Sequence, residues 1–334
     1  MALSTISGRF GAALSLLIAL GCGSNATQEQ SPPAVAEGFV EADDGVQLYY
    51  KSVGEGDQVV VIPVGLYLED LLAPLAKDRR LVFYDPRNRG RSEAAELSTV
   101  SLDRQVADLE AVRRELGIER MALLGWSGLG METAVYAIRH PERVERLVQV
   151  AAVPAASALF ASAGGDRRAE RLDVEAIRAL ETRWQAGGFD STQGEFCRQH
   201  GALTLPGSFA DTSFIRQVPD VCQYENEWPV NLWPYFGALL GSFGEYDWRP
   251  ELQALRVPRL VMHGREDGIP IEGGRAWAAG FETARFIELS PCGHFPFLEQ
   301  REVFLRAVDE FLRGEWPAEA VALPAGEAVA PPRG

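Results

Sequence analysis

The stretch that decides the fold is MALLGWSGLGMETAVYA, residues 121–137. Its first half is an apolar run typical of a buried strand, and its second half has a helical pattern. Ser127 lies at the junction, between the glycines at 125 and 128. Such a turn can hold a serine hydroxyl up as a nucleophile, because small neighbours leave room for its backbone. A glycine-rich turn with a capping serine would leave the same pattern, so the rest of the chain must decide.

Strand-like and helix-like segments alternate on both sides of this stretch. The expected strands are 40–54 (a hairpin turning at Asp44-Gly45), 58–62, 80–85, 120–126, 146–153, 259–264 and 284–289. The expected helices are 68–77, 102–116, 131–139 and 297–312. Regular alternation predicts a mostly parallel, doubly wound α/β sheet with helices on both faces.

The alternation is interrupted between residues 154 and 255, where helical stretches and aromatic clusters replace the buried strands. A segment inserted there should lie over the carboxyl ends of the strands, where α/β sheets bind ligands. We therefore expect a helical cap that walls a pocket, between core segments 39–153 and 256–313. Cys197 and Cys222, 25 residues apart in the cap, could form a disulfide or stay as two buried thiols.

Composition excludes several classes of protein. The 334 residues are 46% hydrophobic and 24% charged, as in ordinary globular proteins. A formal charge of −15 argues against nucleic-acid binding, which needs a basic face. The four cysteines form no CxxC pair, so no zinc site is expected, and no cofactor is implied.

The two ends of the chain are expected to lie outside the fold. Residues 1–21 have the short apolar core of a signal peptide, and Cys22 follows it as in a bacterial lipobox. This pattern predicts an exported cell-envelope lipoprotein, tethered by residues 22–38, although an ordinary secretory signal is the alternative. The Pro- and Ala-rich residues 314–334 are expected to be disordered.

A nucleophilic Ser127 needs a base, and the chain has four histidines. His140 ends a helix, His200 lies in the cap, and His263 closes a strand. His294 lies on the loop between the last strand and the last helix, from which it can reach the serine, so we predict it as the base.

An acid must orient the imidazole and stabilise its charged form. Asp267 follows the strand at 259–264, in the chain order Ser, Asp, His, and Glu266 is its rival. The strand at 146–153 ends without an acid, which removes the other usual location.

Together these features resemble the α/β-hydrolase family over residues 38–313. The clearest support is FYDPRNRGRS, residues 83–92, which is similar to the family's Asp-x-Arg-x-x-Gly-x-Ser turn. The resemblance implies acylation of Ser127, protonation of the leaving group by His294, and hydrolysis by a water that His294 activates. It also implies an oxyanion hole with the backbone N–H of Gly128 as one donor.

Two departures concern that oxyanion hole. The family's His-Gly loop is replaced by Ile-Pro-Val-Gly-Leu at 62–66, so the second donor would be Gly65 or Leu66. The elbow glycine two residues after the serine is replaced by Leu129, which is expected to crowd the strand–helix crossing.

The cap suggests candidate substrate contacts. The cap's placement and the Asp-x-Arg turn resemble the proline-iminopeptidase-like branch, in which cap carboxylates hold an amino group, and this makes Glu225 and Glu227 candidates. Trp126, directly before the serine, is a third. We expect a carboxylesterase or lactonase acting on a small molecule. The alternatives are an aminopeptidase for N-terminal proline, a carbon–carbon bond hydrolase, and an envelope binding protein of this fold without catalysis.

Overall fold

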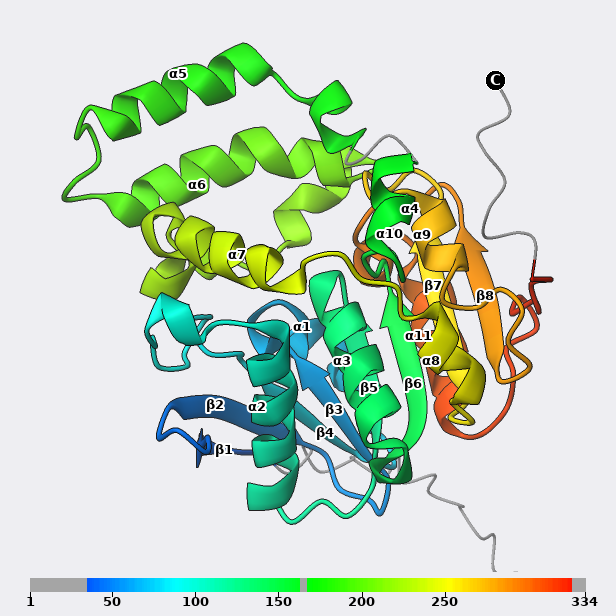
Figure 1. The fold of residues 1–334 in the computed structure, drawn as a ribbon. Helices are drawn as coiled ribbons and strands as arrows, with labels where there is room; N and C mark the ends of the chain where they lie inside the picture. The colour runs from blue at the N-terminus through cyan, green and yellow to red at the C-terminus, as the bar shows by residue number, and fades with distance from the viewer. Residues whose placement is uncertain (1–34, 163–166, 326–334) are drawn as a thin grey trace, which may run out of the picture. The chain divides into compact units, whose positions relative to one another are not determined.

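The computed structural model describes residues 35–162 and 167–325, which are built around an eight-stranded sheet (Figure 1). Its order is β1-β2-β4-β3-β5-β6-β7-β8, with antiparallel pairing for β1–β2 and β2–β4 and parallel pairing elsewhere. The strands are β1 Val35–Glu41, β2 Gln47–Val53, β3 Val59–Pro63, β4 Arg80–Tyr84, β5 Met121–Trp126, β6 Val144–Val150, β7 Arg259–Gly264 and β8 Ala284–Leu289. The predicted α/β class is confirmed.

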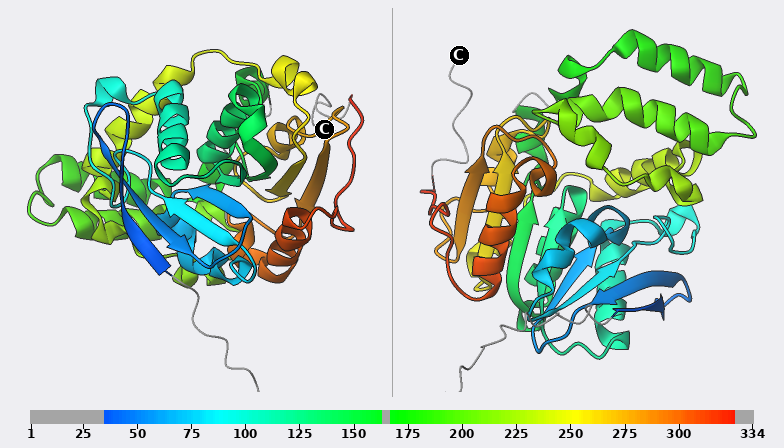
Figure 2. Two further views of the ribbon diagram at one scale, coloured as in Figure 1. Left: turned by 90° about the horizontal axis from the view of Figure 1, so that it is seen from below. Right: turned by 180° about the vertical axis from the view of Figure 1, so that it is seen from behind.

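Helices bury both faces of the sheet, as the apolar strands require. Along β3, Val59 and Val61 join one apolar cluster and Val60 and Ile62 join another, because side chains alternate between faces. Figure 2 shows α11 on the opposite side of the sheet from α2 and α3. The helices of the core are α1 Gly65–Leu72, α2 Leu102–Glu115, α3 Gly128–Arg139, α9 Ile271–Arg275, α10 Pro296–Glu299 and α11 Arg301–Leu312.

The segment between β6 and β7 is helical, and the predicted cap is confirmed. It contains α4 Ser157–Ser162, α5 Val174–Gln185, α6 Gln193–Thr204, α7 Pro229–Phe243 and α8 Arg249–Ala254, with short 3₁₀ turns between them. Trp184 stacks on Phe196 with ring centroids 5.1 Å apart, and Trp233 packs edge-on against both. Cys197 and Cys222 form a disulfide, so the first of the two alternatives holds.

Several expected boundaries are wrong. The predicted tether 22–38 overlaps β1, whose residues from Val35 onward pair with β2. The predicted helix 297–312 is divided at Gln300, whose ψ of 43° is not helical. In the predicted disordered tail, Val321 forms a two-way backbone bridge with Phe286 of β8, and Leu323 accepts from Gly280. A strand at the edge of a sheet leaves backbone N–H and C=O groups unpaired. The start of β1 pairs with such groups of β2, and Val321 of the tail pairs with those of β8 at the opposite edge of the sheet.

Neither Cys22 nor the expected signal peptide falls within residues 35–162 and 167–325, so lipidation and export stay predictions. Among the described helices, none combines the length and the apolar character needed to cross a membrane.

Candidate active site

The turn between β5 and α3 holds Ser127 in an unusual backbone conformation. Its φ is 60° and its ψ is −130°, a region that a residue with a side chain occupies only when its surroundings enforce it. Two bonds do so here: the Ser127 N–H donates to Val150 of β6, and its carbonyl accepts from Gly130. The strained turn lifts the serine side chain out of the sheet at the start of α3.

Glycines at two positions allow this turn. A Cβ on Gly125 would lie 2.3 Å from Thr133 Oγ1, and one on Gly130 would lie 2.7 Å from the Ala152 Cβ. Leu129, expected to crowd the crossing, lines the pocket instead. That expectation is wrong because the helix position that packs tightly against Ala152, two residues after β6, is residue 130, where the chain has glycine.

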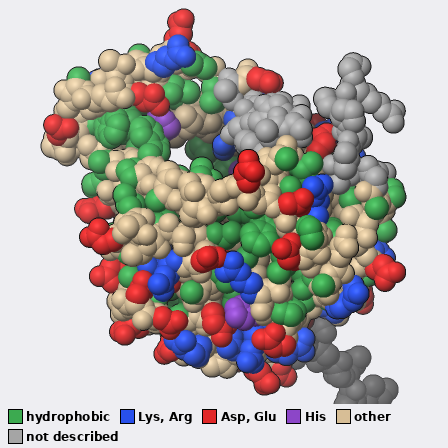
Figure 3. Space-filling view, viewed as in Figure 1, with side chains coloured by type: hydrophobic (Ala, Val, Ile, Leu, Met, Phe, Trp, Pro, Cys, Tyr) green, Lys and Arg blue, Asp and Glu red, His purple; other side chains and the backbone are tan. Residues whose placement is uncertain are grey.

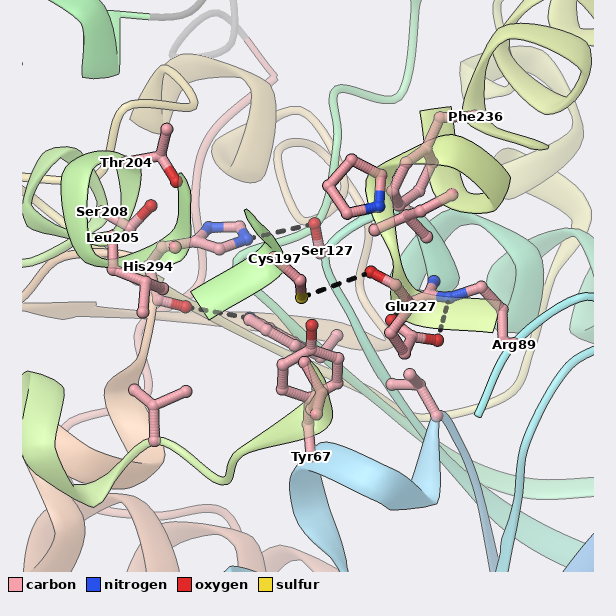
Figure 4. Close-up of a pocket in the computed structure, with 18 of the residues that line it drawn as sticks. Tyr67, Arg89, Ser127, Cys197, Thr204, Leu205, Ser208, Glu227, Phe236 and His294 are labelled. Atoms are coloured by element: carbon pink, nitrogen blue, oxygen red, sulfur yellow. Dashed lines mark hydrogen bonds and ion pairs between the residues drawn. The ribbon is translucent and has the colours of Figure 1, made fainter. Parts of the chain in front are cut away.

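The structure brings Ser127, His294 and Asp267 into one hydrogen-bonded row. His294 Nε2 lies 3.1 Å from Ser127 Oγ, and His294 Nδ1 lies 2.8 Å from Asp267 Oδ2. Figure 4 shows the imidazole turned toward the serine hydroxyl. Asp267 accepts from Nδ1–H, which leaves Nε2 free to accept the serine proton, so the tautomer inferred from these partners suits a general base.

The loop that carries His294 is held at several points. The His294 N–H donates to Ser208 of the cap, and its carbonyl accepts from Trp126 Nε1 at 2.9 Å. Glu299 accepts from the Gly293 N–H at 2.7 Å with one oxygen, and from cap N–H groups at 210 and 211 with the other. The loop therefore links the core to the cap.

Asp267 is buried but stays a carboxylate. Burial alone would raise its pKa, but the His294 and His263 imidazoles and the N–H of Ile269 outweigh burial and hold the pKa below its usual value. His263, also fully buried, donates from Nε2 to the Ile269 carbonyl at 3.0 Å, and burial lowers its pKa. A neutral His263 thus packs against the acid.

The other candidates for acid and base lie elsewhere. Glu266 accepts from the Ser290 hydroxyl and the Cys292 N–H, so its carboxylate positions the loop and does not face the imidazole. His140 ends α3 against Tyr136. His200 lines the pocket, where it contacts Trp233 and lies 3.5 Å from Glu181.

The two oxyanion candidates after β3 differ in what their N–H groups do. Leu66 donates its N–H to Asp85 Oδ1 at 3.1 Å. Gly65 is the first residue of α1, as Gly128 is of α3, and a first-turn N–H has no acceptor within its own helix. Because β3 and β5 are parallel neighbours, both helices begin at the same edge of the sheet. This geometry favours Gly65 over Leu66.

The Asp85–Ser92 loop joins the carboxyl ends of the strands to the cap. Asp85 accepts from Leu66 and from the backbone and side chain of Arg91. Arg89 forms two hydrogen bonds, of 2.8 and 2.9 Å, with the two carboxylate oxygens of Glu227, and Gly90 N–H donates to the same group.

The predicted substrate contacts in the cap have different places. Glu225 is exposed and does not line the pocket, so the structure does not bring it to the site. Glu227 lines the pocket but is already paired with Arg89. Trp126 lines the pocket, and its ring lies 5.2 Å from that of His294. Sequence reasoning missed Arg89, since one arginine in an Arg-rich loop gives no sign of which one faces inward.

These residues surround a cavity of about 940 Å³ between the strand ends and the cap. Its walls are mostly apolar, with contributions from Leu129, Leu232 and Phe243, and the disulfide lies in its wall. On the face drawn in Figure 3, hydrophobic side chains gather around a hollow beneath the cap, whereas charged side chains cover the core below. Within the described ranges, no cluster of three His, Cys, Asp or Glu side chains could hold a metal ion.

A further pocket residue, Glu132 of α3, was also missed. It is 1% exposed, its Oε1 accepts from the Tyr84 hydroxyl at 2.6 Å, and burial raises its pKa to about 8. The signal in the sequence was an acidic residue amid the apolar positions of a helix that follows the serine, and helical periodicity alone gives such a residue no role.

Comparison with known proteins identifies relatives that match most of this chain. A model of the alpha/beta hydrolase fold matches residues 64–300. A proline iminopeptidase of Lactobacillus helveticus (strain DPC 4571) is 25% identical, over 80% of this chain and 95% of that protein. A 2-hydroxy-6-oxononadienedioate/2-hydroxy-6-oxononatrienedioate hydrolase of Paraburkholderia xenovorans (strain LB400) is 23% identical, over 81% and 92% respectively.

Solved structures show the same fold at low identity. An esterase from Exiguobacterium antarcticum superimposes with a TM-score of 0.61 at 20% identity, covering 84% of this chain and all of that one. The proline iminopeptidase of Mycobacterium smegmatis superimposes with a TM-score of 0.62 at 22% identity, covering 83% of this chain and 98% of that one. These similarities establish the architecture and leave the substrate open.

Proposed function

The chain belongs to the alpha/beta hydrolase fold family, and we propose that it is a serine hydrolase with Ser127 as nucleophile, His294 as general base and Asp267 as orienting acid. The observation that carries this proposal is the row of 3.1 and 2.8 Å contacts through the His294 ring. A general base must lie within hydrogen-bond reach of the proton it takes, and Nε2 does.

In the proposed first step, Ser127 Oγ attacks the substrate's carbonyl carbon while its proton passes to His294 Nε2. Asp267 stabilises the resulting imidazolium, and backbone N–H groups of Gly128 and Gly65 stabilise the oxyanion. His294 then protonates the leaving group as the carbonyl reforms. A water that His294 deprotonates hydrolyses the acyl-enzyme and regenerates the serine.

The substrate class we propose is a small carboxylic ester or lactone. A largely apolar cavity of about 940 Å³ suits a small, mostly uncharged molecule. The relatives do not favour one activity over another, because proteins named for two different hydrolytic activities are nearly equally identical to this chain.

An aminopeptidase is the second candidate, since several relatives near 25% identity are proline iminopeptidases. Such an enzyme needs a carboxylate for the substrate's amino group. The pairing of Glu227 with Arg89 and the exposure of Glu225 weigh against it.

The experiment is covalent labelling by a fluorophosphonate probe, read by intact mass, on the wild-type protein and on Ser127→Ala. We expect one adduct on the wild type and none on the variant. A folded wild-type protein that takes no adduct would contradict the proposal and favour the binding-protein alternative. Comparing p-nitrophenyl acetate with prolyl-p-nitroanilide then separates the ester from the aminopeptidase candidate.

A further inference from the structure

The pocket contains a second polar group that the proposed reaction does not use. Glu132 lies five residues after Ser127 on α3, and its side chain lines the same cavity. Its Oε1 accepts from the Tyr84 hydroxyl, but its Oε2 has no hydrogen-bond partner among the described residues. A buried polar atom without a partner is costly, so it calls for an explanation.

The protonation state of Glu132 follows from its surroundings. Burial is the largest influence and raises its pKa to about 8, the Tyr84 hydrogen bond opposes this, and the charge of Asp108 adds to the rise. The carboxyl therefore keeps a proton at pH 7. Since Oε1 accepts from Tyr84, the proton belongs on Oε2, the atom that lacks a partner.

The charged groups around Glu132 already have partners. Asp108 of α2 binds Arg87 with both oxygens, and Arg89 is paired with Glu227. On α7, the Tyr235 hydroxyl accepts from Gln105 of α2. These neighbours therefore supply Glu132 with no unpaired cation, and the missing partner of its O–H is a hydrogen-bond acceptor.

We propose that Glu132 binds an uncharged oxygen of the substrate, of the ketone type, several bonds away from the carbonyl that Ser127 attacks. Five residues of helix rise about 7.5 Å, and helical side chains lean back toward the N-terminus. A short carbon chain can therefore span from the serine to this oxygen. The inference rests on the proposed function, and it narrows the substrate class to keto-substituted esters.

The test compares matched pairs of esters, with and without a ketone, at equal chain length. One series has the ketone at the fourth, fifth or sixth carbon of a p-nitrophenyl acyl chain, and the other has it in the alcohol of a butyrate ester, followed by pH-stat. The quantity measured is the ratio of kcat/KM within each pair, so changes in overall rate cancel. We expect wild-type protein to prefer at least one ketone ester by about 10-fold.

Variants of Glu132 test whether its proton causes the preference for ketone esters. In Glu132→Gln the amide N–H still donates, so most of the preference should remain, whereas Glu132→Leu should abolish it. Glu110→Gln is the matched control, because Glu110 also accepts from a tyrosine, Tyr136 at 2.6 Å, but does not line the pocket. Its preference should equal the wild type's.

The pH dependence gives a second readout. The wild-type preference should fall as pH rises through about 8, where Glu132 loses its proton, and the preference of Glu132→Gln should stay constant. The proposal is overturned if no ketone ester is preferred, or if Glu132→Leu keeps the preference. It is also overturned if an ammonium-bearing ester is preferred and that preference grows with pH.

Failure of the proposed hydrolysis can be told apart from failure of this inference. Calorimetric titration of Ser127→Ala with the same ester pairs measures the ketone preference as a ratio of Kd values, without turnover. If plain esters are not hydrolysed but the Kd ratio depends on Glu132, then the proposed function fails and the ketone site at Glu132 stands. If plain esters are hydrolysed without any ketone preference, then the proposed function stands and the ketone site fails.

Discussion

The serine end of the pocket and its cap end are both polar, but they are held together differently. At the serine end, Ser127, His294 and Asp267 each come from a loop directly after a strand or next to one, and their contacts run along one row. At the cap end, Arg89 and Glu227 are 138 residues apart, and each has the other as its main partner. The first arrangement leaves a proton acceptor facing the cavity, whereas the second neutralises its own charges.

This difference teaches that polar residues in one pocket need not have one kind of role. A polar group that keeps a donor or acceptor directed into the cavity can take part in catalysis. Groups that satisfy each other mainly attach the cap to the core, because a buried charge is tolerated only when it is paired.

The largest expected effect is at the serine end. Asp267→Asn should lower kcat on p-nitrophenyl acetate by about 10³–10⁴-fold, because an amide neither stabilises the imidazolium nor favours the required tautomer. Steady-state kinetics checks this. Glu266→Gln, one residue before, should cost far less, and equal losses in the two variants would break the assignment of the acid.

At the cap end, the expected effect is on stability. Arg89→Met leaves Glu227 buried without its partner, and we expect the free energy of unfolding to fall by about 3–5 kcal/mol. Urea unfolding measures it. The double variant Arg89→Met/Glu227→Leu should recover much of the loss. Arg114→Met, which breaks the exposed pair with Asp43, should leave the free energy of unfolding nearly unchanged, because solvent screens an exposed ion pair.

The disulfide sharpens the comparison within the cap itself. Replacing Cys197 and Cys222 together by alanine removes a cross-link over 25 residues, which we expect to cost about 3 kcal/mol of unfolding free energy. Thermal unfolding with and without reductant provides the check: reductant should lower the Tm of the wild type and leave the double variant unchanged. If reductant does not change the Tm of the wild type, even when the reductant is added to the unfolded protein, the result would argue against the disulfide.

The smallest expected effect concerns the serine turn. Gly130→Ala places a Cβ 2.7 Å from that of Ala152, and such overpacking should cost about 1–3 kcal/mol. Gly128→Ala meets nothing within 4 Å, so its unfolding free energy should be unchanged or slightly raised. Chemical denaturation of the two variants compares them directly. Similar losses would mean that the crossing at residue 130 is looser than the structure has it.

Most of the sheet could be predicted because each strand carries its own apolar pattern and each following helix its own periodicity. Ser127 and His294 were predictable for the same reason, since turn glycines and loop position are local signals. The choice of Asp267 over Glu266 needed the structure to show which carboxylate faces the imidazole, although chain order already favoured it.

Other features had no local signal. The pairing of Val35–Gly38 with β2 and of Val321 with β8 depends on unpaired edges of the sheet, which only the assembled sheet provides. The proposal of Gly65 rather than Leu66 as the second oxyanion donor depends on the hydrogen bond from the Leu66 N–H to Asp85, 19 residues away. Short-range patterns carry no information about such partners.

The sequence by itself therefore determined the doubly wound fold, the cap insertion and the three residues that meet at the serine, because strand–helix order places those loops at one edge of the sheet. Only the tertiary structure decided that Glu227 is neutralised by Arg89, that Glu225 is exposed, and that Glu132 lines the cavity and has one buried oxygen without a partner. The physical reason is that the role of a charged side chain depends on its burial and its partners, and in this protein those partners are distant along the chain.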